Sequence, residues 1–349
     1  MKAGRTLNEL AAEIQRQQET KHDYVADTRK LQMQVDPIQD NPVLQIVGTG
    51  MYPIRSIAHQ QIASRLNISK VYYDRMLMES PGLLVNNVNH WFDAKPEKRM
   101  VRTLDGECRA FLSNRFRPLD NHDLAEAVLP IMFERSDCQV ESCEITETKL
   151  YIKAIWGNVS GEVKVGEVVK SGVMVSNSEV GQGSLSVQPL VFVLRCLNGL
   201  IIPDYGIKKY HVGRNRRDNS EPYELYSDET LAIDDMAVFA KLGDVVRATV
   251  TNFPALLEKM SSTTHQPIND PVKTVELAQE KFQFSDTESG SILKGLAEGG
   301  DMTRWGLIQA ITGASQDVLD YDRATELESL GGQVLELPKS EWEALAAVA

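Results

Sequence analysis

The chain has 349 residues, 42% apolar and 25% charged, a composition typical of a globular protein rather than a disordered one. No apolar run approaches the roughly 18 residues that a membrane-spanning helix needs, and the polar first residues lack a secretory pattern. The four cysteines are too few for a disulfide framework, so we expect reduced thiols in a cytoplasmic protein with no membrane partner.

The net charge of −12 is concentrated late in the chain. From residue 258 to the end there are 7 basic and 16 acidic residues, a balance of −9, whereas residues 1–257 hold 30 basic and 33 acidic residues. The first 257 residues are therefore close to neutral, and the overall acidity does not exclude a polyanionic partner for them. The acidic end fits a solvated helical layer.

Helices and short extended segments come first. Residues 1–29 fit an amphipathic helix followed by a polar connector, and residues 31–47 fit two extended pieces broken by prolines. Residues 56–78 fit two helices joined by a turn, with Ser69 as a suitable N-cap for the second. A further short element is expected over residues 81–93.

Strands dominate the middle of the chain. The segments with strand-like patterns are residues 100–103, 108–112, 138–147, 149–156, 163–176 and 184–197. Asp105-Gly106 is a strong signal for a two-residue hairpin loop. Pro189 cannot donate a ladder hydrogen bond, so we expect a bulge or a strand start there, and Gly181-Gln182-Gly183 fits a hairpin turn. A helix capped by Asp120 or Asn121 interrupts the strands, and Pro130 shortens or kinks it.

Helical periodicity resumes near Glu229, with breaks expected near Pro267–Pro271, Gly299-Gly300 and Gly331-Gly332. The sequence therefore predicts an α+β fold: a mostly antiparallel central sheet flanked by N-terminal helices and a C-terminal helical layer. We divide it into residues 1–95 (helical, with a helix-turn-helix-like segment), 96–225 (sheet core) and 226–349 (acidic and helical).

The predicted hairpin carries the first candidate site. With Asp105-Gly106 as the loop, Arg102 pairs with Arg109 on one face, and Phe111 lies across from Met100. Like charges in direct opposition are destabilising unless an anion lies between them. The candidate nucleic-acid contacts here are Arg102, Arg109, Phe111, Arg115, Phe116 and Arg117, in which arginines would hold phosphates and rings would stack bases. The alternative is that acidic side chains from elsewhere neutralise the arginines.

A second basic cluster covers residues 208–217. Its candidate contacts with a polyanion are Lys208, Lys209, Tyr210, Arg214, Arg216 and Arg217. The alternative is a solvated loop that pairs with the acidic residues directly after it.

The segment His59 to Met76 resembles a helix-turn-helix. Ala63, Asn67 four residues later, and Val71 or Tyr73 approximate the small, turn and apolar positions of that motif. The second helix shows little basic surface, so simple helix packing is the alternative.

The sequence gives no catalytic residue, metal ligand or cofactor motif that we would assign. Cys138 and Cys143 lack a second ligand pair, and no phosphate-binding loop or nucleophile elbow is present. A metal-dependent nuclease could use Asp120, His122 and Asp123, with Glu179, although helix capping explains the first and third more simply.

Three stretches together resemble a family of phage- and plasmid-borne proteins known as domain of unknown function 932. They are Val101–Gly106 with Arg109–Asn121, then Asn177–Gly181 with Arg195–Leu200 and His211–Gly213, then Trp305–Thr312 with Asp320–Glu326. The resemblance spans roughly residues 40–335 and implies a mobile-element protein in the cytoplasm of a bacterial host, among replication and recombination genes. It carries no assigned catalytic residues.

The first hypothesis for function is a nucleic-acid-binding protein of replication or recombination, such as a single-strand annealing or accessory factor. It would work without a cofactor, with single-stranded DNA as partner, and its acidic helices would support self-association into a homo-oligomer. The second is a protein–protein interaction module, such as an inhibitor or regulator of host defence, with a host protein as partner. The third is the metal-dependent nuclease; enzymatic activity is the less favoured expectation.

Overall fold

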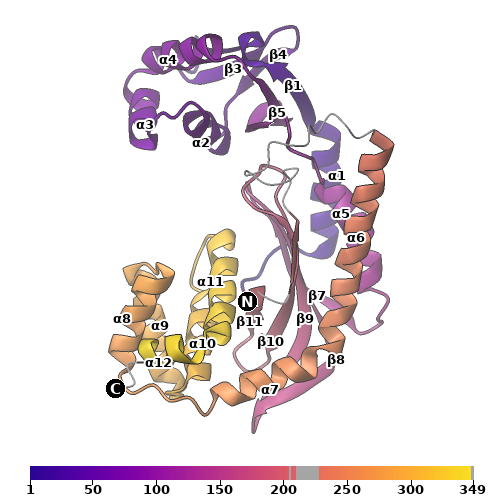
Figure 1. The fold of residues 1–349 in the computed structure, drawn as a ribbon, viewed down its shortest axis with the longest axis vertical. Helices are drawn as coiled ribbons and strands as arrows, with labels where there is room; N and C mark the ends of the chain where they lie inside the picture. The colour runs from indigo at the N-terminus through magenta and orange to yellow at the C-terminus, as the bar shows by residue number, and fades with distance from the viewer. Residues whose placement is uncertain (204–205, 210–227, 347–349) are drawn as a thin grey trace.

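The first part of the chain folds around two small sheets, in a computed structural model that describes residues 1–203, 206–209 and 228–346 (Figure 1). We call residues 22–117 the N-terminal body. Its elements are β1 (His22–Asp27), η1 (Thr28–Lys30), β2 (Leu31–Val35), β3 (Pro42–Ile46), β4 (Gly50–Pro53), α2 (Ser56–Arg65), α3 (Lys70–Glu79), α4 (Pro81–Ala94), β5 (Lys98–Leu104) and β6 (Glu107–Ser113). The strands pair antiparallel in the orders β1-β5-β6 and β2-β3-β4, and α2, α3 and α4 share one hydrophobic core with both sheets.

The central part is one large antiparallel sheet with helices against it. Its elements are α1 (Leu7–Thr20), α5 (Asn121–Met132), β7 (Cys138–Ile145), β8 (Leu150–Lys164), β9 (Glu167–Asn177), β10 (Leu185–Val193), β11 (Asn198–Ile201), β12 (Ile207–Lys209) and α6 (Asp228–Thr251). Strands β7 to β11 pair in sequence order, and β12 pairs with β10. In Figure 1 the long helix α6 runs beside this sheet.

Alternation along β8 sends side chains to both faces of the sheet. Leu150, Ile152 and Ala154 enter the core shared with α1, α5 and α6, whereas Tyr151 and Ile155 pack in a separate cluster. That second cluster includes Tyr321 of α11. The sheet is therefore covered on both faces, which accounts for its apolar strands.

The C-terminal helices form a layer against the sheet. They are α7 (Phe253–Thr263), α8 (Pro271–Phe282), α9 (Asp286–Gly299), α10 (Arg304–Ala314), α11 (Tyr321–Glu336) and α12 (Lys339–Leu345). Local signals set several of their ends: Ser285 and Glu288 form a capping box at the start of α9, and Gly300 ends it with φ of 66°. The predicted α+β fold, with its antiparallel sheet and flanking helices, is confirmed.

Core packing groups the elements differently from the three predicted regions. Leu10 and Ile14 of α1 pack with the central sheet. Val101 and Phe111 of the β5–β6 hairpin pack with α2–α4 in the N-terminal body. Among the described residues, no helix is both long enough and apolar enough to cross a bilayer.

Two predictions about strands were wrong. Residues 163–176 are not one strand, because β8 runs to Lys164 and the chain turns at Gly166, whose φ is 80°. Pro189 is neither a strand start nor a bulge: β10 pairs with β9 without a register shift across it. On its other side β10 changes partner from β12 to β11, and the Pro189 carbonyl accepts from the Ile202 N–H at 2.9 Å. The missing N–H of Pro189 therefore falls where no ladder partner needs it.

The predicted helix break at Gly331-Gly332 was also wrong, because both glycines lie inside α11. A Cβ at Gly332 would lie 1.8 Å from the Ile201 carbonyl oxygen, and one at Gly331 would lie 2.5 Å from Thr312 Cγ2. Glycine is needed here for close packing rather than for a turn. The expected polar connector after the first helix is strand β1.

Candidate nucleic-acid interface

The hairpin of β5 and β6 has the predicted loop but not the predicted register. Asp105 and Gly106 both have positive φ, 54° and 76°, as a type I′ turn requires. Thr103 pairs with Cys108 as expected, but a bulge then places Arg102 opposite Ala110. The predicted pairing of Arg102 with Arg109 was therefore wrong, and so was that of Phe111 with Met100, since Phe111 faces Val101.

Arg102 is completely buried and fully paired. It lies directly opposite Asp23 of β1 and donates to that carboxylate through Nε at 2.8 Å and Nη2 at 2.9 Å. It also donates to Asp120 at 2.8 Å and to the Glu179 carbonyl at 2.9 Å. Burial alone would lower the pKa of Arg102, but Asp120 and Asp23 outweigh burial and hold that pKa above its usual value.

Arg109 is also buried, and it contacts the Glu179 side chain. Its Nη2 donates to Glu179 Oε2 at 2.7 Å, and the other Glu179 oxygen accepts from the Asn121 N–H at the start of α5. We call Asp23, Arg102, Arg109, Asp120 and Glu179 the junction cluster, because it joins the N-terminal body to the central sheet. Arg102 and Arg109 are therefore neutralised by acidic side chains from other parts of the chain, which was the alternative interpretation of the hairpin.

The aromatic candidates of the hairpin are also buried. Phe111 stacks on Phe92 with ring centroids 5.7 Å apart, and Phe116 lies under the Arg102 guanidinium at 5.7 Å. Neither side chain is open to a base. Arg117 pairs with two aspartates of α6, and Arg115 is exposed.

Most of the second basic cluster lies outside the described residues, namely Tyr210, Arg214, Arg216 and Arg217. Lys208 and Lys209 are in β12, opposite Ser186 and Leu185, and the Lys208 side chain is exposed.

Two residues of the nuclease hypothesis, Asp120 and Glu179, are used in ion pairs. Burial would raise the pKa of Asp120, but Arg102 and Lys21 outweigh burial and hold that pKa below its usual value. Glu179 is held by Arg109. In the described part of the chain no three His, Cys, Asp or Glu side chains are gathered as a metal ion would need.

The turn between the two helices of the segment that resembles a helix-turn-helix is well formed. Asn67, between α2 and α3, has φ of 55°, the left-handed conformation that lets the chain reverse in a short turn. The Ile68 N–H donates to the Ala63 carbonyl at 2.9 Å, and Ser69 caps α3 by accepting from the Tyr72 N–H at 3.4 Å. The two helices are therefore joined by a four-residue connection with its own hydrogen bonds.

The inner faces of α2 and α3 pack as a unit. Ile62, Ala63, Tyr73 and Met76 are all buried, so Tyr73 rather than Val71 takes the apolar position beyond the turn. His59 Nδ1 lies 2.8 Å from the Tyr73 hydroxyl, and the two rings meet edge to face. Burial lowers the pKa of His59 to about 4, so this histidine is neutral at pH 7.

The outer face of α3 is open. Val71 is 82% exposed and Met78 is 79% exposed, and Arg75 is between them on the same side of the helix. Among the described residues, Lys70 and Arg75 pair only with Asp74 and Glu79, one turn further along α3, in exposed contacts. Such pairs contribute only about 0.3–0.5 kcal/mol, so both cations can exchange their partners for another anion.

Charge is unevenly distributed between the N-terminal body and the rest of the protein. Residues 22–117 hold 13 Lys and Arg against 10 Asp and Glu, a balance of +3, within a chain of net charge −12. The remainder therefore carries −15. A polyanion would therefore be repelled less by the N-terminal body than by the rest of the chain taken together.

The sequence analysis missed the exposed stripe of α3. Its signal is the spacing Val71, Arg75 and Met78, at i, i+4 and i+7, on the opposite side from Tyr73 and Met76. Comparison with known proteins adds nothing: no family model, no curated protein and no solved structure matches the chain. The resemblance to domain of unknown function 932 stays a prediction from its motifs.

Proposed function

We propose that the protein binds duplex DNA through the helix-turn-helix of α2 and α3, with the outer face of α3 entering the major groove. The observation that carries the proposal is the outer face of α3, which leaves Lys70, Val71 and Arg75 exposed beyond a well-formed turn. The second helix of this motif reads the groove in many DNA-binding proteins.

The chemistry of this face suits a groove. A guanidinium such as that of Arg75 can contact the acceptor edge of guanine, and an apolar side chain such as Val71 can contact the methyl group of thymine. The cation of Lys70, in the first turn of α3, suits a phosphate. The balance of +3 in the N-terminal body favours the approach of DNA to this end.

This proposal keeps nucleic acid as the partner, but it moves the contacts from the hairpin to α3 and replaces single-stranded DNA with duplex DNA. A single-strand preference depended on Phe111 and Phe116 as stacking rings, and both are buried. We also propose a role in replication or recombination of a mobile element. This part of the proposal rests only on the resemblance of the three sequence stretches to domain of unknown function 932.

The experiment is fluorescence anisotropy with a labelled pool of random duplex DNA and its single strands, from low to near-physiological salt. We expect binding at low salt that weakens as salt rises, with the duplex preferred. Lys70→Ala/Arg75→Ala should weaken duplex binding by about tenfold or more and reduce the salt slope. The matched control is Lys273→Ala/Lys281→Ala on α8, which changes the charge equally and should bind like the parent protein.

Absence of binding at low salt would refute the proposal, and so would equal affinities for the parent and the α3 variant. Tighter binding to the single strands would leave a nucleic-acid function but remove the major-groove geometry.

A protein partner is the second candidate, because Val71 and Met78 are apolar and strongly exposed. A partner held by these side chains would be lost in Val71→Ser/Met78→Ser and retained in Lys70→Ala/Arg75→Ala. Its binding would depend weakly on salt. The pair of variants therefore separates the two candidates on one face.

A further inference from the structure

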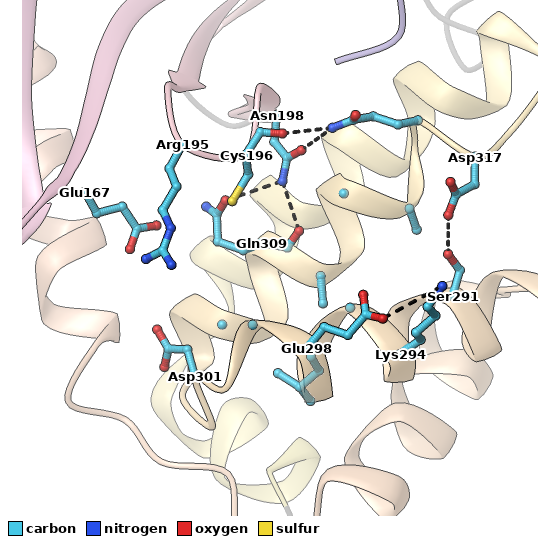
Figure 2. A pocket seen from close by; sticks show the side chains of 18 of the residues that line it. Glu167, Arg195, Cys196, Asn198, Ser291, Lys294, Glu298, Asp301, Gln309 and Asp317 are labelled. Carbon is cyan, nitrogen blue, oxygen red and sulfur yellow. Dashed lines mark hydrogen bonds and ion pairs between the residues drawn. The ribbon is translucent and has the colours of Figure 1, made fainter.

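A pocket of about 510 Å³ lies between the C-terminal helices α9 and α10 and the edge of the central sheet. The turn between β10 and β11 contributes Arg195 and Cys196, and small residues such as Gly295, Ala310 and Gly313 line the helical side (Figure 2). Small-molecule sites generally have volumes of about 300–1,000 Å³. The pocket therefore has room for a metabolite of up to nucleotide size.

The two carboxylates nearest the sheet already have partners. Glu167 is buried, accepts from the Trp305 indole N–H at 2.8 Å and pairs with Lys164 at 3.2 Å. Asp301 pairs with the same Lys164 at 2.5 Å and accepts from the Thr303 hydroxyl at 2.6 Å. Neither carboxylate is left to recognise a cationic ligand.

The carboxylates on the helical side are also engaged. Asp317 accepts from the Ser291 hydroxyl at 2.5 Å, and Glu298 lies 3.9 Å from the Lys294 ammonium on the same helix. Figure 2 shows both contacts beside the pocket. The acidic groups of the lining are therefore all matched with a donor or a cation.

The Gln309 amide group is different, because a chain of hydrogen bonds fixes its orientation. Gln316 donates to the Asn198 side-chain oxygen at 2.6 Å, so the Asn198 amide nitrogen must face Gln309. That nitrogen donates to the Gln309 backbone oxygen at 3.2 Å and lies 3.5 Å from Gln309 Oε1. Gln309 Nε2 therefore points away from Asn198, and this buried donor has no acceptor among the described residues.

Arg195 supplies a second uncommitted donor to the same pocket. Its side chain has no ion-pair or hydrogen-bond partner among the residues that the structure describes. Figure 2 shows it extending from the turn toward the side of the pocket where Glu167 lies. Its charge influences the neighbouring thiol: burial, with Glu167, raises the pKa of Cys196, while Arg195 and Lys164 oppose that shift.

We infer that this pocket binds a small molecule through an oxyanion, a phosphate or carboxylate group, held by the Arg195 guanidinium and the Gln309 amide. The uncommitted groups are both donors, so the matching ligand is an acceptor. A guanidinium binds these anions through paired N–H donors. A buried donor without an acceptor is unfavourable, and a ligand oxygen at Gln309 would relieve that. The inference does not depend on the proposed DNA contact, which involves α3.

Cys196 provides a reporter inside the site. It lines the pocket and is exposed, whereas Cys108 and Cys143 are buried and Cys138 is half-buried. The full-length protein is treated with N-ethylmaleimide, which carries no charge, and modification of the Cys196 peptide is followed by mass spectrometry. The probes are inorganic phosphate, adenosine monophosphate and succinate, which separate phosphate from carboxylate and small anion from nucleotide.

We expect at least one probe to slow modification of Cys196, by about tenfold at ten times its Kd. Arg195→Ala should abolish the protection. Gln309→Glu, which keeps the oxygen facing Asn198 but replaces the free donor with an acceptor, should abolish it as well. Lys273→Ala, on the exposed surface of α8, is the control and should be protected like the parent protein.

Each variant is first compared with the parent by circular dichroism and by its rate of modification without probe, so that a folding defect is recognised. The inference would be overturned if none of the three probes protected Cys196 at about 10 mM. Such a result would mean a Kd weaker than that of ordinary small-molecule sites. Protection that survives both Arg195→Ala and Gln309→Glu would overturn it too, since the anion would then bind elsewhere.

Discussion

The junction cluster and the outer face of α3 both display arginine, but they use it in opposite ways. Arg102 is fully buried, with acids from two other segments around it. Arg75 is exposed, and it pairs with Glu79, one turn away on the same helix. In the sequence the hairpin looked the better nucleic-acid site, because its arginines alternate with aromatic residues. The structure shows that the number of cations in a segment does not decide whether the segment can bind an anion. The groups that surround each cation decide it.

The two settings also differ in energy. A buried guanidinium has lost its hydration and depends on its partners, whereas an exposed ion pair gains little and can be exchanged. Removal of a cation should therefore affect stability at the junction cluster and ligand binding on α3. The predictions below test this separation.

The largest effect is expected for Arg102→Met. This change leaves Asp23 without its partner in the cluster and Asp120 with Lys21 alone, and breaking a buried pair costs about 3–5 kcal/mol. Urea denaturation of the purified protein measures the loss. Arg75→Met, the matched change on α3, should alter the free energy of unfolding by no more than about 0.5 kcal/mol.

A loss below about 1 kcal/mol in Arg102→Met would show that the junction cluster is solvated in solution, since that is the range of surface pairs. The distinction between the two arginines would then disappear.

Local features of the hairpin could be predicted from the sequence, but its surroundings could not. Asp105-Gly106 encodes its turn within two residues, and the pairs next to the turn follow from it. The bulge at Arg109 inserts one residue and changes every later pair, and no signal in the turn announces it. Because Asp23 and Glu179 are about 80 residues away on either side of Arg102, nothing local could identify them as its partners.

The same reasoning explains the other results. The helices α2 and α3 and the turn between them could be predicted because their signals fall within one short segment. The glycines of α11 were misinterpreted because glycine marks both a turn and a close approach, and only the neighbouring Ile201 backbone distinguishes these uses. The pocket near Arg195 could not be predicted, since its walls come from segments around residues 164, 196, 295 and 310.

Acidification should weaken the α2–α3 unit rather than the junction cluster. Burial lowers the pKa of His59 to about 4 in the folded protein, against 6.5 for the ordinary side chain. The unfolded chain therefore binds a proton that the folded chain refuses between pH 6.5 and 4. The contribution of His59 to stability is complete above pH 6.5 and falls by about 3 kcal/mol as the pH approaches 4.

Nuclear magnetic resonance titration of His59, with urea denaturation at several pH values, measures this effect. His59→Gln should flatten the dependence between pH 6.5 and 4, whatever its effect on stability at pH 7. Titration of His59 near its ordinary pKa would mean that the contact with Tyr73 is open in solution, and α3 would then lack the support that the proposed DNA contact requires.

The smallest effect is expected at two turns, the hairpin loop next to the junction cluster and the turn before α3, which share a left-handed residue. Asp105 and Asn67 have φ of 54° and 55°, but Asp105 also pairs with Arg16 and accepts from Thr20, whereas Asn67 is exposed. Asn67→Ala should therefore isolate the backbone cost of a left-handed residue, about 1 kcal/mol, and Asn67→Gly should be close to neutral.

Urea denaturation of both variants, with anisotropy on duplex DNA, gives the comparison. Since Asn67 lies outside the proposed contact face, both variants should bind DNA like the parent protein once folded. Loss of binding in Asn67→Gly at unchanged stability would place the turn itself in the interface, and the recognition surface would then extend from α3 back toward α2.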